Sequence, residues 1–215
     1  MRYSDTHKAE THARLLQIAG RMLREKGPEN LAVAEVMKEA GLTHGGFYAH
    51  FKSKDALLTE ALGRVFDSGR YKFERATEGM PPRHALGAYI DFYVSTRHRD
   101  GIAHGCPVTA LTSDSPRQSR KFRAAFDAGV QRLVTALAAR IDEARIPSDD
   151  GHALAASILS AMAGAVAISR AVSDKRLSDE MLEAARESIK ARLGVTDADL
   201  AKEKFPQAVR SEVLQ

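Results

Sequence analysis

The 215-residue sequence contains a single cysteine and no long uninterrupted run of apolar residues. One cysteine excludes a disulfide within the chain and is typical of proteins in a reducing cytosol. The longest apolar stretch, 153–172, is interrupted by three serines and an arginine, so we expect no membrane span. Residues 1–14 are largely polar and charged, unlike a secretory leader. The sequence therefore predicts a cytoplasmic protein that has no membrane partner.

The patterns of common catalytic sites are also missing. We find no phosphate-binding loop, no nucleophile elbow and no pair of carboxylates placed for catalysis. The spacing of His98, His104 and Cys106 matches no familiar zinc site. The sequence therefore predicts neither an enzyme nor a bound metal or cofactor.

Positive charge is concentrated near the beginning of the chain. The net charge is +4, and residues 1–54 contain nine Lys or Arg against six acids, together with four histidines. This pattern fits either a solvated basic surface or a module that docks on phosphate. Charge alone does not separate the two interpretations.

Helical periodicity runs through nearly the whole sequence, and no segment alternates as a strand does. Helices are expected to end at Gly27-Pro28, to cover 31–40, to run from a Thr43 cap to about 51, and to begin again at a Ser53 cap. Further helices are expected at about 86–93, 108–111, 116–144, 149–172 and 178–193, the last opened by Ser178. We expect an all-α protein of about nine helices. It would comprise a three-helix head over 1–53, a helical body over 54–195, and a tail over 196–215 that forms a further helix or is loosely ordered.

The second and third helices, joined by Ala40-Gly41-Leu42, have the length and turn of a helix-turn-helix, whose second helix enters the DNA major groove. Residues that face the groove must be polar or small, and hydroxyl, imidazole and ammonium groups suit the flanking phosphates. Phe47 and Phe51 are apolar and are expected to hold this helix to the core of the head. The predicted DNA contacts are Thr43, His44, Gly45, Gly46, Tyr48, His50 and Lys54.

The double glycine is informative, because each glycine costs roughly 1 kcal/mol in a helix interior relative to alanine. Gly45 and Gly46 are interpreted as positions of close approach to DNA. They contribute little direct readout, so Thr43, His44 and the deformability of the DNA are expected to carry more of the specificity.

The segment 31–58 resembles the DNA-binding head of the TetR family, whose signature ends in a Tyr-x-His-Phe-x-x-Lys pattern. Tyr48, His50, Phe51 and Lys54 match that pattern in register, and the length and number of helices also resemble the family's fold. The sequence departs from the family at 32–34, where Ala-Val-Ala replaces residues that touch DNA in many members. Basic contacts are instead expected from an N-terminal arm, through Arg2, Tyr3, Lys8 and Arg14.

The resemblance implies a dimeric repressor whose body binds a small effector and whose last two helices dimerise. A two-fold protein matches a palindromic operator, and effector binding would tilt the fourth helix and change the separation of the heads. Plain core packing is the alternative for both predicted sets. The predicted effector pocket comprises Phe66, Tyr89, Phe92, Tyr93, Cys106, Phe126 and Met162. The predicted dimer interface comprises Leu154, Ile158, Ala161, Ala165, Ile168, Leu182, Ala185 and Ile189.

Cys106 admits three interpretations: a sensor of electrophiles or oxidants, as in some relatives with a cysteine in this region; a buried inert thiol; or a metal ligand. The alternative to a regulator is a helical small-molecule-binding protein or enzyme that uses the neighbourhood of Cys106 and His104.

Overall fold

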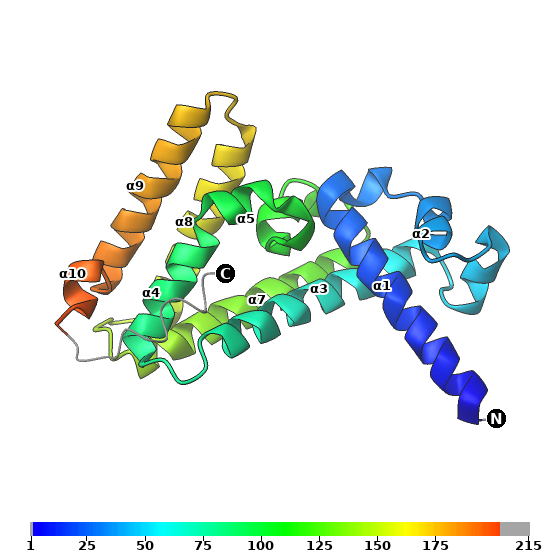
Figure 1. Ribbon diagram of the computed structural model, residues 1–215, viewed down its shortest axis with the longest axis horizontal. Helices are drawn as coiled ribbons and strands as arrows, with labels where there is room; N and C mark the ends of the chain where they lie inside the picture. The colour runs from blue at the N-terminus through cyan, green and yellow to red at the C-terminus, as the bar shows by residue number, and fades with distance from the viewer. Residues whose placement is uncertain (1, 203–215) are drawn as a thin grey trace. The chain divides into compact units, whose positions relative to one another are not determined.

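The computed structural model describes residues 2–202, with the side chains of 2–5, 70–73, 75 and 76 left aside (Figure 1). The described residues are helical and contain no strand, which confirms the all-α prediction. The α-helices are α1 (Arg2–Asn30), α2 (Val33–Glu39), α3 (Lys54–Ala76), α4 (Pro82–Tyr93), α5 (Thr96–Asp100), α6 (Pro107–Leu111), α7 (Arg120–Glu143), α8 (Gly151–Ala171), α9 (Lys175–Leu193) and α10 (Asp197–Leu200). Three short 3-10 helices are η1 (His44–Ala49), η2 (Ile102–His104) and η3 (Ser115–Arg117).

The chain forms two compact units. The first comprises residues 1–69 and 102–129, and the second comprises 70–101 and 130–215. Each unit combines segments that are distant in the sequence, and α3 and α7 each contribute residues to both. The sequence-based boundaries at 53 and 195 remain predictions.

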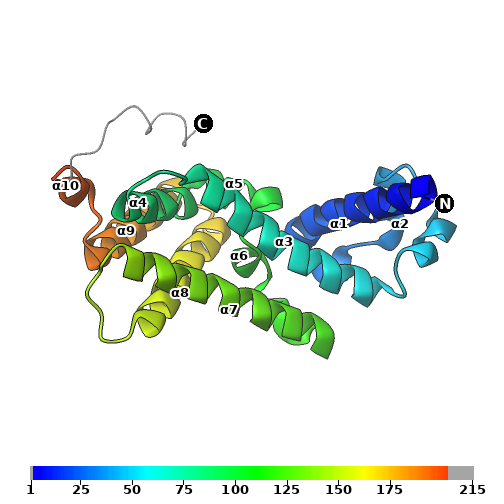
Figure 2. The same ribbon diagram turned by 90° about the horizontal axis from the view of Figure 1, so that it is seen from below.

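The first unit is built around α1, which contacts α2, η2 and α6. Leu15 and Leu23 of α1 and Leu57 of α3 are fully buried in its core. The first parts of α3 and α7 lie side by side in this unit (Figure 2), where the ring of Phe66 lies directly over Gly129. A side chain at position 129 would collide with that ring, so the glycine permits this close packing.

Local chemistry sets the ends of several helices as the sequence predicts. The helical path of α1 breaks at Gly27, where φ is 77°, a conformation that glycine adopts without a Cβ penalty. The Ser53 hydroxyl accepts a hydrogen bond from the Ala56 N–H at 3.1 Å, which confirms the predicted cap of α3. The predicted Ser178 cap is wrong. Asp174 accepts hydrogen bonds from the first turn of α9 instead, and Ser178 lies one turn inside the helix.

In the second unit, α8 and α9 pack against each other, α4 packs on α9, and α5 packs on α8 (Figure 1). Buried charges join these helices. Arg99 of α5 is 3% exposed and donates hydrogen bonds to Ser178 and Asp179 of α9. Arg170 of α8 donates to the carbonyls of His98 and Arg99 at 2.7 and 2.8 Å.

A second buried cation holds the end of α9. Lys190 is 3% exposed, and its Nζ lies 3.1 Å from Asp91 of α4 and 3.0 Å from Asp197 of α10. Thr196 and Asp199 form a capping box at the start of α10. These contacts place α10 within the second unit, whereas residues 203–215 of the predicted tail lie outside the described residues.

By length and composition alone, α8 is apolar enough to cross a membrane. One such helix is weak evidence, because a packed helix of a globular protein passes the same test. One face of α8 packs on α5 and α9, and its outward positions are mostly small residues such as Ala153, Ser160 and Gly164. These outward positions make α8 a candidate surface for contact with another chain.

Candidate nucleic-acid interface

The predicted recognition helix is a 3-10 helix, η1, rather than an α-helix from 43 to 51. Thr43 stands at its N-cap position, but the Thr43 side chain accepts no capping hydrogen bond, so that part of the prediction is wrong. Gly45 and Gly46 explain the difference, because two adjacent glycines disfavour the α-helix by roughly 1 kcal/mol each. A short 3-10 segment tolerates this weak helical preference.

The start of η1 faces outward. Thr43, His44 and Gly45 are exposed, and the Tyr48 side chain is 72% exposed. The edge of the Tyr48 ring meets Phe47, with centroids 5.3 Å apart. The Tyr48 ring therefore packs against the buried Phe47, while most of the Tyr48 side chain is exposed to solvent.

Phe47 and Phe51 are each 3% exposed and stack with their ring centroids 5.7 Å apart. Their predicted role in holding η1 to the head is confirmed. η1 makes its main contacts with α2, and together these elements give the helix-turn-helix its two arms. Gly41 joins them with φ at 68°, the left-handed conformation expected of a turn glycine.

Neither glycine of η1 is required by packing inside the chain. A Cβ at Gly45 would meet nothing within 4 Å, and one at Gly46 would make an ordinary contact with Met37 at 3.6 Å. Neither residue has a positive φ. No contact among the described residues therefore requires glycine at either position.

Two predicted basic contacts also have partners within the head. The Nζ of Lys54 donates to the Glu29 carbonyl at the end of α1, at 3.0 Å. Arg14 donates to the Ala40 carbonyl at the end of α2. Arg14 thus holds two head helices together, and its contact with DNA stays a prediction; Lys54 likewise keeps two further donor protons for a phosphate. The side chains of Arg2 and Tyr3 lie outside the described part.

The acids of α1 and α2 are largely neutralised by their neighbours. Arg21 pairs with both Glu25 and Glu39, and Lys26 lies 2.7 Å from Glu35. Other cations of the head have no carboxylate partner in the part of the chain that the structure describes: Lys8, Lys38, Lys52, Lys54 and Arg64. Ion pairing removes cations and acids together and leaves the net charge of the head unchanged, but it leaves the remaining positive charge on the cations that have no acidic partner.

Lys38 and Lys52 were not among the predicted contacts. Both are exposed, Lys38 near the end of α2 and Lys52 between η1 and α3. Their positions on either side of η1 were readable from the sequence. Only the structure shows that they lack an acidic partner.

His50 differs from the other predicted contacts because it is half-buried. Its Nδ1 is buried and has no hydrogen-bond partner among residues 2–202. Burial lowers the pKa of His50 below its usual value of 6.5, and the positive charges of His12 and Lys8 lower it further. Both effects disfavour the protonated form of the His50 imidazole.

The residues of the predicted effector pocket belong to both units. Phe66, Phe126 and Cys106 lie in the first unit, where the edge of Phe66 meets Phe126 at 5.9 Å. Tyr89, Phe92, Tyr93 and Met162 lie in the second unit. Tyr93 and Met162 are buried and Phe92 is 48% exposed, so these side chains do not share one environment. The pocket stays a prediction.

The predicted dimer residues differ in how deeply the single chain buries them. Ile158, Ala165, Leu182 and Ile189 are between 0% and 8% exposed in the single chain and belong to its own core. They are therefore removed from the candidate interface, in favour of the core packing weighed as the alternative. Leu154, Ala161 and Ala185 are half-buried, and Ile168 is 52% exposed.

Cys106 is half-buried at the N-cap of α6, and His104 is exposed at the end of η2. Arg24 of α1 faces Cys106. Burial lowers the pKa of Arg24, while the negative charge that Cys106 carries as a thiolate raises it. Among the described residues, no group of three His, Cys, Asp or Glu side chains could hold a metal ion.

The all-α fold, the helix-turn-helix and its exposed basic surroundings define a DNA-binding regulator. A model of bacterial regulatory proteins of the tetR family matches residues 15–61, and one for the C-terminal domain of LmrA/YxaF-like transcriptional regulators matches residues 82–188. The chain belongs to the TetR family of transcriptional regulators.

Individual relatives are distant. The chain is 26% identical to the uncharacterised HTH-type transcriptional regulator YfiR of Bacillus subtilis, over 64% of this chain and 68% of that protein. It is 31% identical to the HTH-type transcriptional repressor KstR2 of Mycolicibacterium smegmatis, but over only 40% of this chain and 42% of that protein. The crystal structure of Escherichia coli NemR in its reduced form superposes with a TM-score of 0.73 at 22% identity, covering 85% of this chain and 96% of that one. At this identity the likeness shows the fold alone.

Proposed function

We propose that this regulator is a cytoplasmic repressor that binds a palindromic operator as a homodimer and is released by a small-molecule effector. The exposed, acid-poor surface around η1 carries the proposal. Tyr48, Lys52 and Lys54 supply one hydroxyl and two ammonium groups around a segment slim enough, at Gly45 and Gly46, to lie close to a groove. The relative KstR2 is named a repressor, which supports the direction of regulation.

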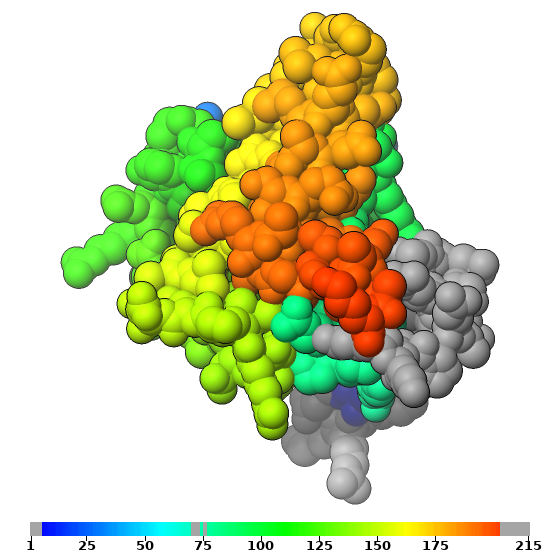
Figure 3. All heavy atoms as spheres, turned by 90° about the vertical axis from the view of Figure 1, so that its left-hand side faces the viewer, coloured from blue at the N-terminus to red at the C-terminus, as the bar shows by residue number. Residues whose placement is uncertain are grey.

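The homodimer is proposed to form through the outward face of the α8–α9 pair (Figure 3). Small or apolar residues recur there at helical spacing on α8, at Ser157, Gly164 and Ile168. On α9, Leu177 and Ala184 continue the face, and the Arg192 guanidinium reaches the Ser157 hydroxyl at 3.1 Å, which places the two stripes beside each other. A two-fold axis through this face would present two heads to a palindrome.

The effector is proposed to act through α3, which begins at Lys54 and contributes residues to both units. An effector changes DNA affinity only if it binds one head spacing better than the other. A ligand that binds free and operator-bound protein with equal affinity is therefore not the effector.

We propose no turnover at Cys106 and His104, because Cys106 is half-buried against Arg24 while His104 is exposed.

The test begins with selection of bound fragments from genomic DNA, followed by fluorescence anisotropy on the recovered palindrome and on a shuffled duplex. We expect a dissociation constant of about 10⁻⁸ M or lower for the palindrome. Binding should weaken steeply as the salt concentration rises. Lys52→Ala should weaken binding to all duplexes and lower the slope of log K against log salt by about 1. Lys121→Ala, an exposed lysine of α7 outside the helix-turn-helix, is the matched control.

Tyr48→Phe separates the hydroxyl from the ring, since it preserves the packing on Phe47. Lys54→Ala is less clean, because it also removes the hydrogen bond to the Glu29 carbonyl. Equal binding of palindrome and shuffled duplex by the unaltered protein at low salt would refute the proposed function.

A further inference from the structure

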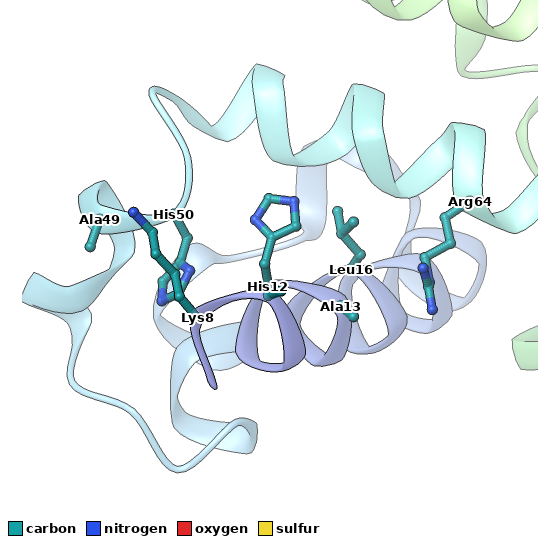
Figure 4. Close-up of a pocket in the computed structure, with 8 residues that line it drawn as sticks. Lys8, His12, Ala13, Leu16, Ala49, His50 and Arg64 are labelled. Atoms are coloured by element: carbon teal, nitrogen blue, oxygen red, sulfur yellow. The ribbon is translucent and has the colours of Figure 1, made fainter. Parts of the chain in front are cut away.

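A groove in the head lies between α1 and α3, beside the end of η1 (Figure 4). Its volume is about 420 Å³, within the range of roughly 300–1,000 Å³ found for small-molecule sites. Leu16 and three alanines give it an apolar lining. The polar lining consists of Lys8, His12, His50 and Arg64.

All four polar side chains are cations or bases. Lys8 and His50 lie at one end of the groove, His12 lies near its middle and Arg64 lies at the far end (Figure 4). Lys8 and Arg64 have no carboxylate partner among the residues whose side chains the structure describes. A groove that gathers positive charge in this way attracts an anion.

The acid that contacts the groove is already engaged. Glu60 of α3 lies 3.0 Å from Nε2 of His12, and the His12 ring stacks on Phe51 with centroids 4.5 Å apart. These two contacts fix the plane of the His12 ring. His12 is thereby held 6.3 Å, between ring centroids, from His50.

His50 is the least satisfied member of the cluster. Its Nδ1 lacks a partner, and Lys8 and His12 both disfavour its protonated form. An anion seated between these groups would reverse that effect, since it would stabilise positive charge on each of them.

We propose that Lys8, His12 and His50 form a binding site for a tetrahedral oxyanion of the phosphate type. The oxyanion comes either from the DNA backbone beside the recognition segment or from free phosphate in solution. The DNA source rests on the proposed function, and the free source does not. Lysine and protonated histidine both donate charge-assisted hydrogen bonds, which are the strong contacts available to phosphate oxygens.

Binding at this site is linked to protons. The groups that face His50 and its groove are Lys8 and His12 from α1 and Glu60 and Arg64 from α3. Because an anion favours the protonated imidazole, its binding takes up a proton, and affinity rises as pH falls. The gain is at most tenfold for each pH unit and each histidine that becomes protonated.

The free source is tested on the DNA-free protein by following the His50 ring proton by NMR. Sulfate is the probe for the pH series, because it does not titrate in this range, and inorganic phosphate is the second probe. At constant ionic strength, sulfate should raise the pKa of His50 in the unaltered protein and in Lys121→Met, but not in Lys8→Met. A ring proton that responds to neither anion contradicts a free-anion site.

The DNA source is tested by operator binding at pH 6 and pH 8. Lys8→Met should lower the salt slope by about 0.9, the value for one phosphate contact, and His50→Gln should reduce the gain in affinity at pH 6. An effect on DNA without an NMR response assigns the site to the DNA backbone. An NMR response without an effect on DNA assigns it to free phosphate, and both together show a site that takes the oxyanion from either source. If neither appears, the oxyanion site is refuted. If the unaltered protein shows no operator preference, the proposed function fails while the NMR result still decides the free site.

Discussion

The pKa of His98 shows how strongly the surroundings of a residue change its protonation. It is 5% exposed, its Nδ1 lies 2.6 Å from the Tyr93 carbonyl, and its ring is flanked by Phe92 and Tyr93. Burial lowers the pKa of His98 to about 4, the Tyr93 carbonyl partly opposes this, and the charge of Arg170 adds to the lowering. The folded protein therefore holds a neutral imidazole at this position.

This pKa predicts a loss of stability in mild acid. Between about pH 6.5 and pH 4 the unfolded chain binds a proton at His98 that the folded chain does not, so the free energy of unfolding falls as pH falls. The contribution is about 2 kcal/mol at pH 5. Urea unfolding at pH 7 and pH 5 measures it.

The matched variant is His98→Asn, which keeps a donor near the position of Nδ1 but does not titrate. It should be less stable than the unaltered protein at pH 7 and lose less stability on going to pH 5. Parallel pH profiles for the two proteins would show that His98 is not the group responsible.

At the scale of elements, η1 is a 3-10 helix where the sequence predicts a longer helix from Thr43 to about 51. A Cβ fits at Gly45 and Gly46, so Gly45→Ala and Gly46→Ala should leave the free energy of unfolding unchanged or raise it by up to about 1 kcal/mol. Operator affinity should nevertheless fall, because the added methyl group lies on the surface proposed to approach DNA. Thermal unfolding and anisotropy on the same samples separate the two effects.

Gly63→Ala is the control for this pair, since a Cβ at Gly63 would also meet nothing within 4 Å, but this glycine lies within α3. It should gain comparable stability and keep operator affinity. If the η1 variants bind the operator as tightly as Gly63→Ala does, the close-approach interpretation of the double glycine is wrong.

Local patterns predicted those elements whose partners are nearby in sequence. The Ser53 cap and the burial of Phe47 and Phe51 follow from residues a few positions apart. The Thr43 cap failed because adjacent glycines weaken the helix that it would have opened. The sequence predicted Lys8 and His50 as separate DNA contacts, but not the groove that they share with His12, since the fold alone brings these residues together.

Helical periodicity identifies an apolar stripe but not the neighbour that covers it. Ile158 and Leu182 share their spacing with truly outward residues, and only the packing of α8 on α9 shows that both are internal. The burial of Arg99 was equally hidden, because its partner Asp179 is 80 positions away. The fold class was therefore predictable, while the contact surfaces were not.

At the scale of the whole molecule, the proposed dimer has a direct test. Ile168 is 52% exposed on α8, and Ile168→Glu would place a charge in the proposed interface, where an unpaired charge is costly. We expect the variant to sediment as a monomer and to bind the palindrome at least about tenfold more weakly, since one head then engages only one half-site.

Ile102→Glu provides the comparison, because Ile102 is an exposed isoleucine of the first unit, 38% accessible. It introduces the same charge at a similar site and should remain dimeric. A dimer in both variants would move the interface away from α8.

The ion pairs within α1 and α2 also bear on how quickly the protein finds DNA. With Glu25, Glu35 and Glu39 held by Arg21 and Lys26, the field ahead of the recognition segment comes mainly from the unpaired lysines. Such a field accelerates diffusional encounter and orients the approaching molecule, and it is screened beyond about 8 Å at physiological salt. These unpaired lysines therefore govern the rate of association more than the final affinity.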